Sequence, residues 1–284
     1  NAASQIQAIN AAKNAALGQS VGLPYYWEIG DQNGLLVSGS YGLPALDPTV
    51  QISIASATKW LFGAYAAQSL TLLESDFPFL NMTSGYVNMN GQCQQNDTVD
   101  SCLATGTYDN HSPGYDGIFY YNSGHMEHFA SNRLGLGSDH IIALRTAFEA
   151  ALGVSKIQFT QPLMAGGAFV APNTYAAFLR KILRGELAIA GLLGSHAVPA
   201  SLYFGGVVSP APQLEPWRYS VGHWLEPDGS FSSAGSYGFY PWIDKTKTFY
   251  GIVARDDETQ SNDTIGIDAV RIGQAIRHAF LRAQ

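Results

Sequence analysis

The sequence predicts an α+β fold, an α/β sandwich whose antiparallel sheet is built from both ends of the chain. Three observations predict it: strand patterns lie near both termini, helical patterns fill the middle, and a helical pattern stands at each end of the chain. We expect the two terminal helices to flank the sheet, which is formed by residues 1–55 and 206–284. A mostly helical subdomain, residues 56–205, is then inserted between these two segments.

The N-terminal part predicts a helix followed by a hairpin. Alanine and isoleucine recur at helical spacing from Ser4 to Leu17, and Gly18 ends the pattern. Apolar runs at 25–29 and 35–41 flank a polar Asp-Gln-Asn-Gly turn, which is typical of a β-hairpin. After a loop, an apolar helix is expected from near Ser56 to about Leu73.

The remaining elements follow in chain order. Residues 76–116 are rich in Gly, Asn, Asp, Ser and Thr and predict a long irregular excursion. Helices are expected at 124–134, 139–152 and 174–183. Strands are expected at 219–225, 230–240 and 248–254, and a last amphipathic helix at 265–281.

The composition argues against several partners. The chain has 15 Lys and Arg against 22 Asp and Glu, a net charge of −7, and no basic run, so nucleic acid and anionic membranes are poor candidates. No apolar stretch reaches the ~18 residues that a membrane span needs. We expect a small-molecule substrate, and neither a cofactor nor a metal.

Cys93 and Cys102 are the two cysteines, and they enclose a polar segment. A disulfide here would contribute about 2–3 kcal/mol on the chain-entropy model. The alternatives are two free thiols or a metal site, which would want more Cys or His close by. We expect the disulfide and therefore a secreted or periplasmic location. A first residue Asn1 rather than Met is expected of a processed or trimmed product.

Ser56-Ala-Thr-Lys59 is the first candidate for chemistry. A spacing of three places both side chains on one helical face, one turn apart. A serine hydroxyl is a weak nucleophile until a base takes its proton, and a lysine does so only when an apolar setting lowers its pKa. The apolar flanks of this segment predict such a setting. The alternative is an N-capping serine beside a solvent-facing lysine.

Two later segments could complete a site. Tyr120-Tyr121-Asn122 offers a phenol as a second proton carrier and an amide that can orient a substrate. Ser233-Ala-Gly235-Ser236 lies in a predicted strand of small residues, whose backbone amides could hold a carbonyl oxygen. Each segment also fits ordinary packing, as an aromatic turn or a kinked strand.

Together the Ser-x-x-Lys, Tyr-x-Asn and small-small-Gly segments, in this order, resemble the penicillin-recognising serine enzymes, in particular their esterase and class C β-lactamase branch. The segments 166–179 and 219–224 extend the resemblance over nearly the whole chain. It implies a β-lactamase-like fold with the site between its two parts. The implied catalytic residues are Ser56 as the acylated nucleophile with Lys59 and Tyr120 as base and acid.

The resemblance also implies the substrate-binding groups. Asn122 would orient the substrate, Ser233 and Gly235 belong to the third motif, and the amides of Ser56 and Ser236 would form the oxyanion hole. If the tyrosine is read one place later, Tyr121 carries the role, but alignment on Asn122 favours Tyr120.

One departure bears on the substrate. The family's third motif usually opens with Lys or His, whereas Ser233 stands here, so the cation that would hold a substrate carboxylate is missing. We therefore expect a carboxylesterase, with a β-lactamase or a D-amino-acid-specific peptidase or amidase as the alternative. A non-turnover acylated sensor or a decayed hydrolase is a further alternative. Concentrated aromatic residues favour an apolar or aromatic acyl group; they are Trp60, Tyr121, Trp224, Tyr237, Phe239 and Trp242.

Two rival signals are weaker. Gly18-Gln-Ser20-Val-Gly22 matches a nucleophile elbow, but it follows a helix and precedes a strand, so a turn at a helix end is favoured. His125 and His128 share a helical face, as in a metal site, but they lack the fuller zinc signature.

Overall fold

The computed structural model describes residues 2–18, 24–204, 208–256 and 263–284, with side chains in the last range from 266 onward. An eight-stranded sheet has the order β2-β1-β11-β10-β9-β8-β7-β6, and its neighbouring strands are antiparallel. Its strands are β1 (Tyr25–Asp31), β2 (Leu35–Tyr41), β6 (Val198–Pro199), β7 (Arg218–Tyr219), β8 (Trp224–Leu225), β9 (Phe231–Ser232), β10 (Tyr240–Ile243) and β11 (Phe249–Ala254). The predicted fold class is confirmed, because N-terminal strands pair with C-terminal strands in this sheet.

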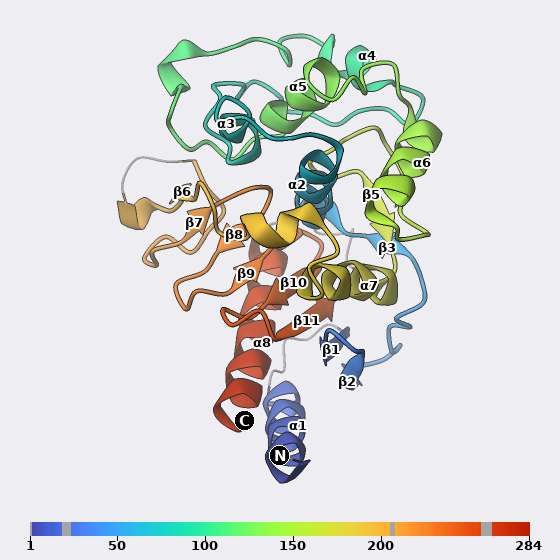
Figure 1. Ribbon diagram of the computed structural model, residues 1–284, viewed down its shortest axis with the longest axis vertical. Coiled ribbons are helices and arrows are strands. Elements are labelled where there is room, and N and C mark those ends of the chain that lie inside the picture. Colours follow the sequence, from blue (N-terminus) through green and yellow to red (C-terminus); the bar gives the residue numbers. More distant parts are fainter. Residues whose placement is uncertain (1, 19–23, 205–207, 257–262) are drawn as a thin grey trace.

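The two terminal helices lie together against the sheet. Helix α1 (Ala2–Leu17) packs on α8 (Asp263–Arg282) and on β2, while α8 also packs on β10 and β11. Figure 1 shows both helices below the sheet with the two ends of the chain close by. Helix α7 (Pro172–Leu183) also packs on β11.

The helices α2 (Thr58–Ser69), α3 (Phe77–Leu80), α4 (Val99–Leu103), α5 (Gly124–Asn132) and α6 (Ile141–Leu152) form the part of the molecule above the sheet in Figure 1. The structure also has the 3-10 turns η1 (Ala55–Ala57), η2 (Pro113–Tyr115), η3 (Ala188–Leu192) and η4 (Leu202–Phe204), of which η4 lies at the sheet edge beside β6. A small sheet with the order β3-β5-β4 lies among the helices; its strands are β3 (Ile52–Ser53), β4 (Gln158–Phe159) and β5 (Ala168–Val170). Strand β6 comes from the predicted insertion, yet it joins the large sheet. The division of the chain into a sheet unit and an inserted unit stays a prediction.

Helix α2 is the central element of the helical part. Every residue from Thr58 to Ala67 is buried, as expected of a helix that is apolar on all sides. The helix ends at Ser69 instead of the predicted Leu73, because Leu70 has extended backbone angles.

Two predicted strands are wrong in detail, since each is a tight hairpin. Residues 219–225 turn between β7 and β8, where Gly222 has φ +69° and a Cβ would lie 2.2 Å from the Lys59 carbonyl oxygen. Residues 230–240 turn between β9 and β10, where Gly238 has φ +94°. The turn at Gly222 is explained by its contact with α2. The residue pattern within 219–225 does not show this contact, because α2 is distant in the sequence. The third motif therefore lies in a turn rather than on an edge strand.

The long segment before α5 is irregular, as predicted, apart from α3, α4 and η2. The predicted disulfide joins Cys93 and Cys102 and packs with Met89 and Leu163 in a small buried cluster. Within the described ranges, no helix is both long and apolar enough to cross a membrane.

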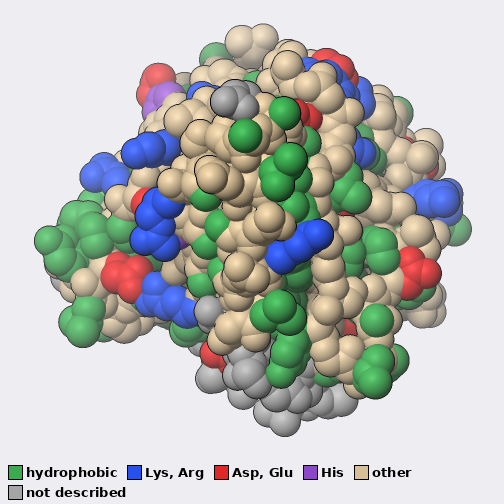
Figure 2. Space-filling view, turned by 90° about the horizontal axis from the view of Figure 1, so that it is seen from below, with side chains coloured by type: hydrophobic (Ala, Val, Ile, Leu, Met, Phe, Trp, Pro, Cys, Tyr) green, Lys and Arg blue, Asp and Glu red, His purple; other side chains and the backbone are tan. Residues whose placement is uncertain are grey.

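One edge of the molecule carries exposed apolar side chains. Leu202, Tyr203 and Phe204 of η4 are exposed, and so is Leu214. Figure 2 shows apolar side chains protruding at the left, the side on which Figure 1 places β6.

Candidate active site

Ser56 lies in η1, the 3-10 turn that leads into α2. Because it belongs to the first turn, its backbone amide has no partner within the helix. The preceding residue, Ala55, has φ +42°, a strained conformation for a residue with a side chain. The Thr58 hydroxyl donates to the Ala55 carbonyl at 2.6 Å and fixes this turn. The backbone thus holds Ser56 in one orientation at a half-buried position.

Lys59 lies one turn further, and the expected contact with Ser56 is present. Its Nζ lies 2.9 Å from the Ser56 Oγ and donates to the Ala165 carbonyl at 2.7 Å. Lys59 is only 3% exposed, and this burial lowers its pKa to about 7. A neutral amine can keep its donation to Ala165 and accept the Ser56 proton. The solvent-facing alternative for Lys59 does not hold.

The two tyrosines lie in different places. The Tyr121 ring covers Lys59, with 4.6 Å from Nζ to the ring centroid, and stacks on Trp224 at 5.4 Å. The Tyr120 ring instead meets Tyr115 edge to face, and its backbone carbonyl is bonded to the imidazole of His125. The geometry therefore favours Tyr121 over Tyr120 as the phenol beside the lysine.

The last residue of the motif shows the same shift by one position, because Ser123 rather than the predicted Asn122 lies at the pocket. Asn122 donates to the Met89 carbonyl at 3.1 Å and accepts from the Gly124 amide at 2.8 Å, so it secures the start of α5. Ser123, one place later, lines a pocket together with Ser56 and Lys59. Tyr121 and Ser123 therefore line the pockets beside Ser56, whereas the predicted pair of Tyr120 and Asn122 does not.

Three residues of the third motif lie next to Ser56, and each of them makes a different contact. They are Ser233, Gly235 and Ser236. Ser233 is buried, and its hydroxyl donates to the Ser56 carbonyl at 3.2 Å, so it supports the backbone of Ser56. Gly235 lies so close to the chain that a Cβ would fall 2.2 Å from the Ile54 carbonyl oxygen, and its amide donates to Phe239 at 2.7 Å. Ser236 lines pockets on both sides of Ser56, and its amide donates to no other backbone group in the described chain.

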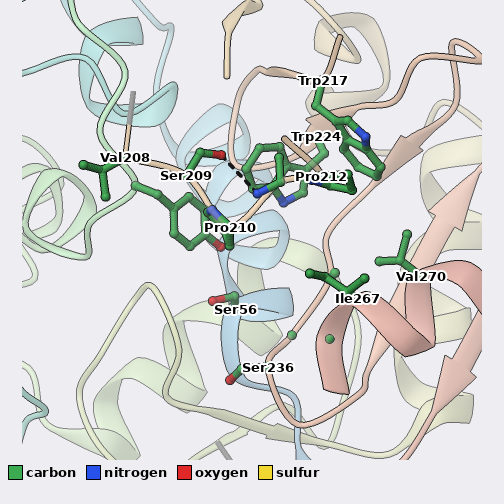
Figure 3. A pocket seen from close by; sticks show the side chains of 15 residues that line it. Ser56, Val208, Ser209, Pro210, Pro212, Trp217, Trp224, Ser236, Ile267 and Val270 are labelled. Atoms are coloured by element: carbon green, nitrogen blue, oxygen red, sulfur yellow. Dashed lines mark hydrogen bonds between the residues drawn. The ribbon is translucent and has the colours of Figure 1, made fainter. Parts of the chain in front are cut away.

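An apolar pocket of about 280 Å³ opens on one side of Ser56. Figure 3 shows Trp217 and Trp224 on one wall and Ile267 and Val270 of α8 on another, with Ser56 and Ser236 beside them. The segment 208–212 closes it, and the Ser209 hydroxyl accepts from the Ala211 amide at 3.1 Å. No charged side chain is among its lining residues in the described part of the chain.

A second pocket, of about 310 Å³, opens on the other side and is mainly polar. Ser56 and Ser236 are common to both pockets. Its other walls include Asn90 and Gln92 beside the disulfide loop, and Gln161, whose amide donates to Gln92. Lys59 is its one charged lining residue within the described ranges. The Ser56 hydroxyl therefore stands where an apolar and a polar pocket meet.

Sequence reasoning missed part of this site. Of the predicted aromatic residues, Tyr121, Trp224 and Tyr237 line the pockets, whereas Trp60, Phe239 and Trp242 belong to the core. The missed groups are the Ala165 carbonyl, Ser123 and the α8 side of the apolar pocket. The Gly-Gly pair at 166–167 was the available signal for Ala165, since it directly follows that residue.

The rival sites gain no support from the described chain. His125 is buried between the Ser84 hydroxyl and the Tyr120 carbonyl, while His128 stacks on Tyr86. No cluster of three or more His, Cys, Asp and Glu that could hold a metal ion occurs in the described ranges. The Gly18–Gly22 motif falls mostly on residues 19–23, outside the described residues.

Three solved structures are similar to this chain over nearly their whole length. The hydrolase EstCE1, which has promiscuous acyltransferase activity, gives a TM-score of 0.66 at 11% identity, covering 96% of this chain and 98% of the other. A penicillin-binding protein from Bacillus halodurans gives 0.62 at 14%, covering 92% and 98%. Simvastatin synthase from Aspergillus terreus gives 0.60 at 14%, covering 95% and 98%.

These identities are low, so the similarity concerns the fold. The chain matches no protein-family model, and no curated protein matches it in sequence. The structural likeness agrees with the resemblance carried by the sequence motifs, and the chain shares the fold of these solved structures.

Proposed function

We propose that this protein is a serine hydrolase of the carboxylesterase type, which forms an acyl-enzyme on Ser56. The observation that carries the proposal is the 2.9 Å contact between the buried Lys59 amine and the Ser56 hydroxyl, placed where two pockets meet. The disulfide supports the expected secreted or periplasmic location.

The first step is proton transfer from Ser56 to Lys59. Because burial lowers the Lys59 pKa to about 7, the amine is largely neutral at mildly alkaline pH and can accept this proton. The Ser56 oxygen then attacks the ester carbonyl and forms a tetrahedral intermediate. In this proposal the amides of Ser56 and Ser236 donate to its oxyanion, which is supported by the absence of other backbone acceptors for them among the described residues.

Collapse of the intermediate releases the alcohol. The proton reaches the alcohol oxygen from Lys59, with the Tyr121 phenol as the second carrier in the pathway. Water then attacks the acyl-enzyme, Lys59 takes its proton, and the carboxylic acid leaves with Ser56 restored. The ester bond breaks once and one water is consumed.

The two pockets support a neutral ester with an apolar acyl group. The acyl chain fits the pocket lined by Trp217, Trp224 and Ile267, and the alcohol fits the polar side. β-Lactamase and D-amino-acid peptidase activities are less supported, because their carboxylate-bearing substrates would meet no cation other than Lys59 among the described lining residues.

The test combines labelling with turnover. We expect a fluorophosphonate to add to the intact protein and to Ser69→Ala, an exposed-serine control at the end of α2, but not to Ser56→Ala. Intact mass and peptide mapping locate the adduct, and p-nitrophenyl butyrate measures turnover. Labelling of Ser56→Ala at another residue contradicts the nucleophile. Labelling without steady turnover would instead indicate an acylated sensor or a decayed hydrolase.

A further inference from the structure

Glu127 has a buried carboxyl group that takes no part in the reaction steps proposed for Ser56. It lies on α5 and is 1% exposed. Its Oε1 accepts from the Ala165 amide at 3.1 Å, and the neighbouring Met164 amide also favours the ionised carboxyl, whereas its Oε2 makes no hydrogen bond of normal geometry with the described residues. A buried carboxyl oxygen without a partner is uncommon and calls for an explanation.

The Ala165 residue connects Glu127 to the site through its backbone. Its amide donates to Glu127, and its carbonyl accepts from the Lys59 Nζ at 2.7 Å. The Lys59 Nζ in turn contacts the Ser56 Oγ at 2.9 Å. Ala165 and Lys59 thus connect the Glu127 carboxyl on α5 to the Ser56 hydroxyl by a continuous path of hydrogen bonds.

Glu127 and Lys59 also act on each other electrostatically. Burial raises the Glu127 pKa to about 8, while burial lowers the Lys59 pKa to about 7. The Glu127 charge raises the Lys59 pKa, and the Lys59 charge lowers that of Glu127. Two such groups titrate as a pair, so their ionisations are coupled.

The other titratable groups around α5 have partners elsewhere. On α5 itself, His125 bonds to Ser84 and the Tyr120 carbonyl, and His128 lies 3.5 Å from Asp109. Asp76, which precedes α3, pairs with Arg133. Asp100 of α4 accepts from Ser131, and the Tyr121 ring lies over Lys59. Of these groups, only Glu127 acts on the Lys59 pKa.

We propose that Glu127 is a positioning residue for the reaction at Ser56: its carboxyl fixes the Ala165 peptide, whose carbonyl holds Lys59 beside the Ser56 hydroxyl. The inference rests on the proposed function of Ser56 and Lys59. When Glu127 is ionised it favours the lysine ammonium, and when it is protonated it favours the free amine that can accept the serine proton.

Glu127→Gln separates the charge from the hydrogen bond. The glutamine carbonyl can still accept from the Ala165 amide, but the negative charge is lost. Because the Glu127 pKa of about 8 lies above the Lys59 pKa of about 7, the carboxyl is largely protonated where Lys59 titrates. Glu127→Gln should therefore leave the acid limb of kcat/KM for p-nitrophenyl butyrate in place. Glu127→Met also loses the acceptor for the Ala165 amide and should lower kcat by about tenfold or more. The control Glu74→Gln removes an equal charge from an 87% exposed side chain and leaves the limb unchanged.

A titration that does not depend on activity separates this inference from the proposed function. The chain has six lysines, and ¹³C NMR of ε-labelled lysine follows Lys59 directly, assigned with Lys59→Arg. We expect the Lys59 signal to titrate near pH 7 in the unmodified protein and at the same pH in Glu127→Gln. A Lys59 step that moves to lower pH in Glu127→Gln would show that a carboxylate charge, rather than the hydrogen bond to Ala165, acts on the lysine, and it would overturn the positioning role. A Lys59 step near pH 7 with no matching acid limb in kcat/KM contradicts the role of Lys59 in the reaction.

Discussion

At the scale of single residues, the position of one phenol ring decides how the tyrosine motif is read. Tyr120 and Tyr121 are adjacent in the sequence. Each is followed two residues later by a polar residue that fits the motif, Asn122 for Tyr120 and Ser123 for Tyr121. The structure separates them by packing. Trp224 stacks on Tyr121 and holds its ring over Lys59, while Tyr115 packs on Tyr120 outside both pockets.

Tyrosine-to-phenylalanine variants test this reading, because each removes one hydroxyl and keeps the ring. We expect Tyr121→Phe to lower kcat/KM for p-nitrophenyl butyrate by about 10²-fold or more, the scale of losing a positioned proton carrier. Tyr120→Phe is the matched control and should change kcat/KM by less than about threefold. The opposite ranking would return the role to Tyr120.

At the scale of elements, α8 contributes both to the sheet and to the apolar pocket. Ile267 and Val270 line the pocket, and Arg277 anchors the same helix further along. Arg277 is fully buried and donates to Glu226 at 2.7 Å and to Asp228 at 2.8 Å, next to the turn between β8 and β9. A buried ion pair of this kind fixes how the helix sits on the sheet.

Two arginines of α8 provide a matched comparison of stability. Arg277→Met leaves the buried Glu226 without its cation, so we expect a loss of about 3–5 kcal/mol in the free energy of unfolding. Arg271→Met breaks the exposed pair with Glu215 and should cost less than about 1 kcal/mol. Urea denaturation followed by circular dichroism measures both. Equal losses in the free energy of unfolding would contradict a larger contribution of the buried ion pair to stability.

At the scale of the whole molecule, the site is poor in charge. The protein carries a net charge of −7, and the lining of the two pockets offers only Lys59 as a cation within the described chain. Ser233, at the position where the third motif of the family that the sequence resembles usually has Lys or His, is buried and bonded to the Ser56 carbonyl. A carboxylate would enter this site with little compensation for its lost hydration.

Substrate preference follows from this charge distribution. We expect kcat/KM for a short-chain p-nitrophenyl ester to exceed that for a chromogenic cephalosporin, since the ester needs only the oxyanion hole and the apolar pocket. Both substrates are measured on one preparation, with Ser56→Ala as the blank for each. A cephalosporin value equal to or above the ester value would indicate a β-lactamase instead.

The sequence by itself determined the features that depend on local spacing. Ser56 and Lys59 are three residues apart on one helical turn, so their contact follows once the helix forms. Cys93 and Cys102 are close along the chain, which makes their disulfide easy to expect. The apolar patterns at both termini likewise predict the sheet and the helices that flank it.

Only the tertiary structure decided the features that depend on distant contacts. Gly222 turns the predicted strand because α2 approaches it, and Trp224 selects Tyr121 over its neighbour. Glu127 reaches Lys59 through Ala165, which lies 38 residues away from Glu127 along the chain. A local pattern records which residues can form a helix or a strand, but burial and partners arise from packing between segments. The pKa values and roles of the site residues follow from that packing.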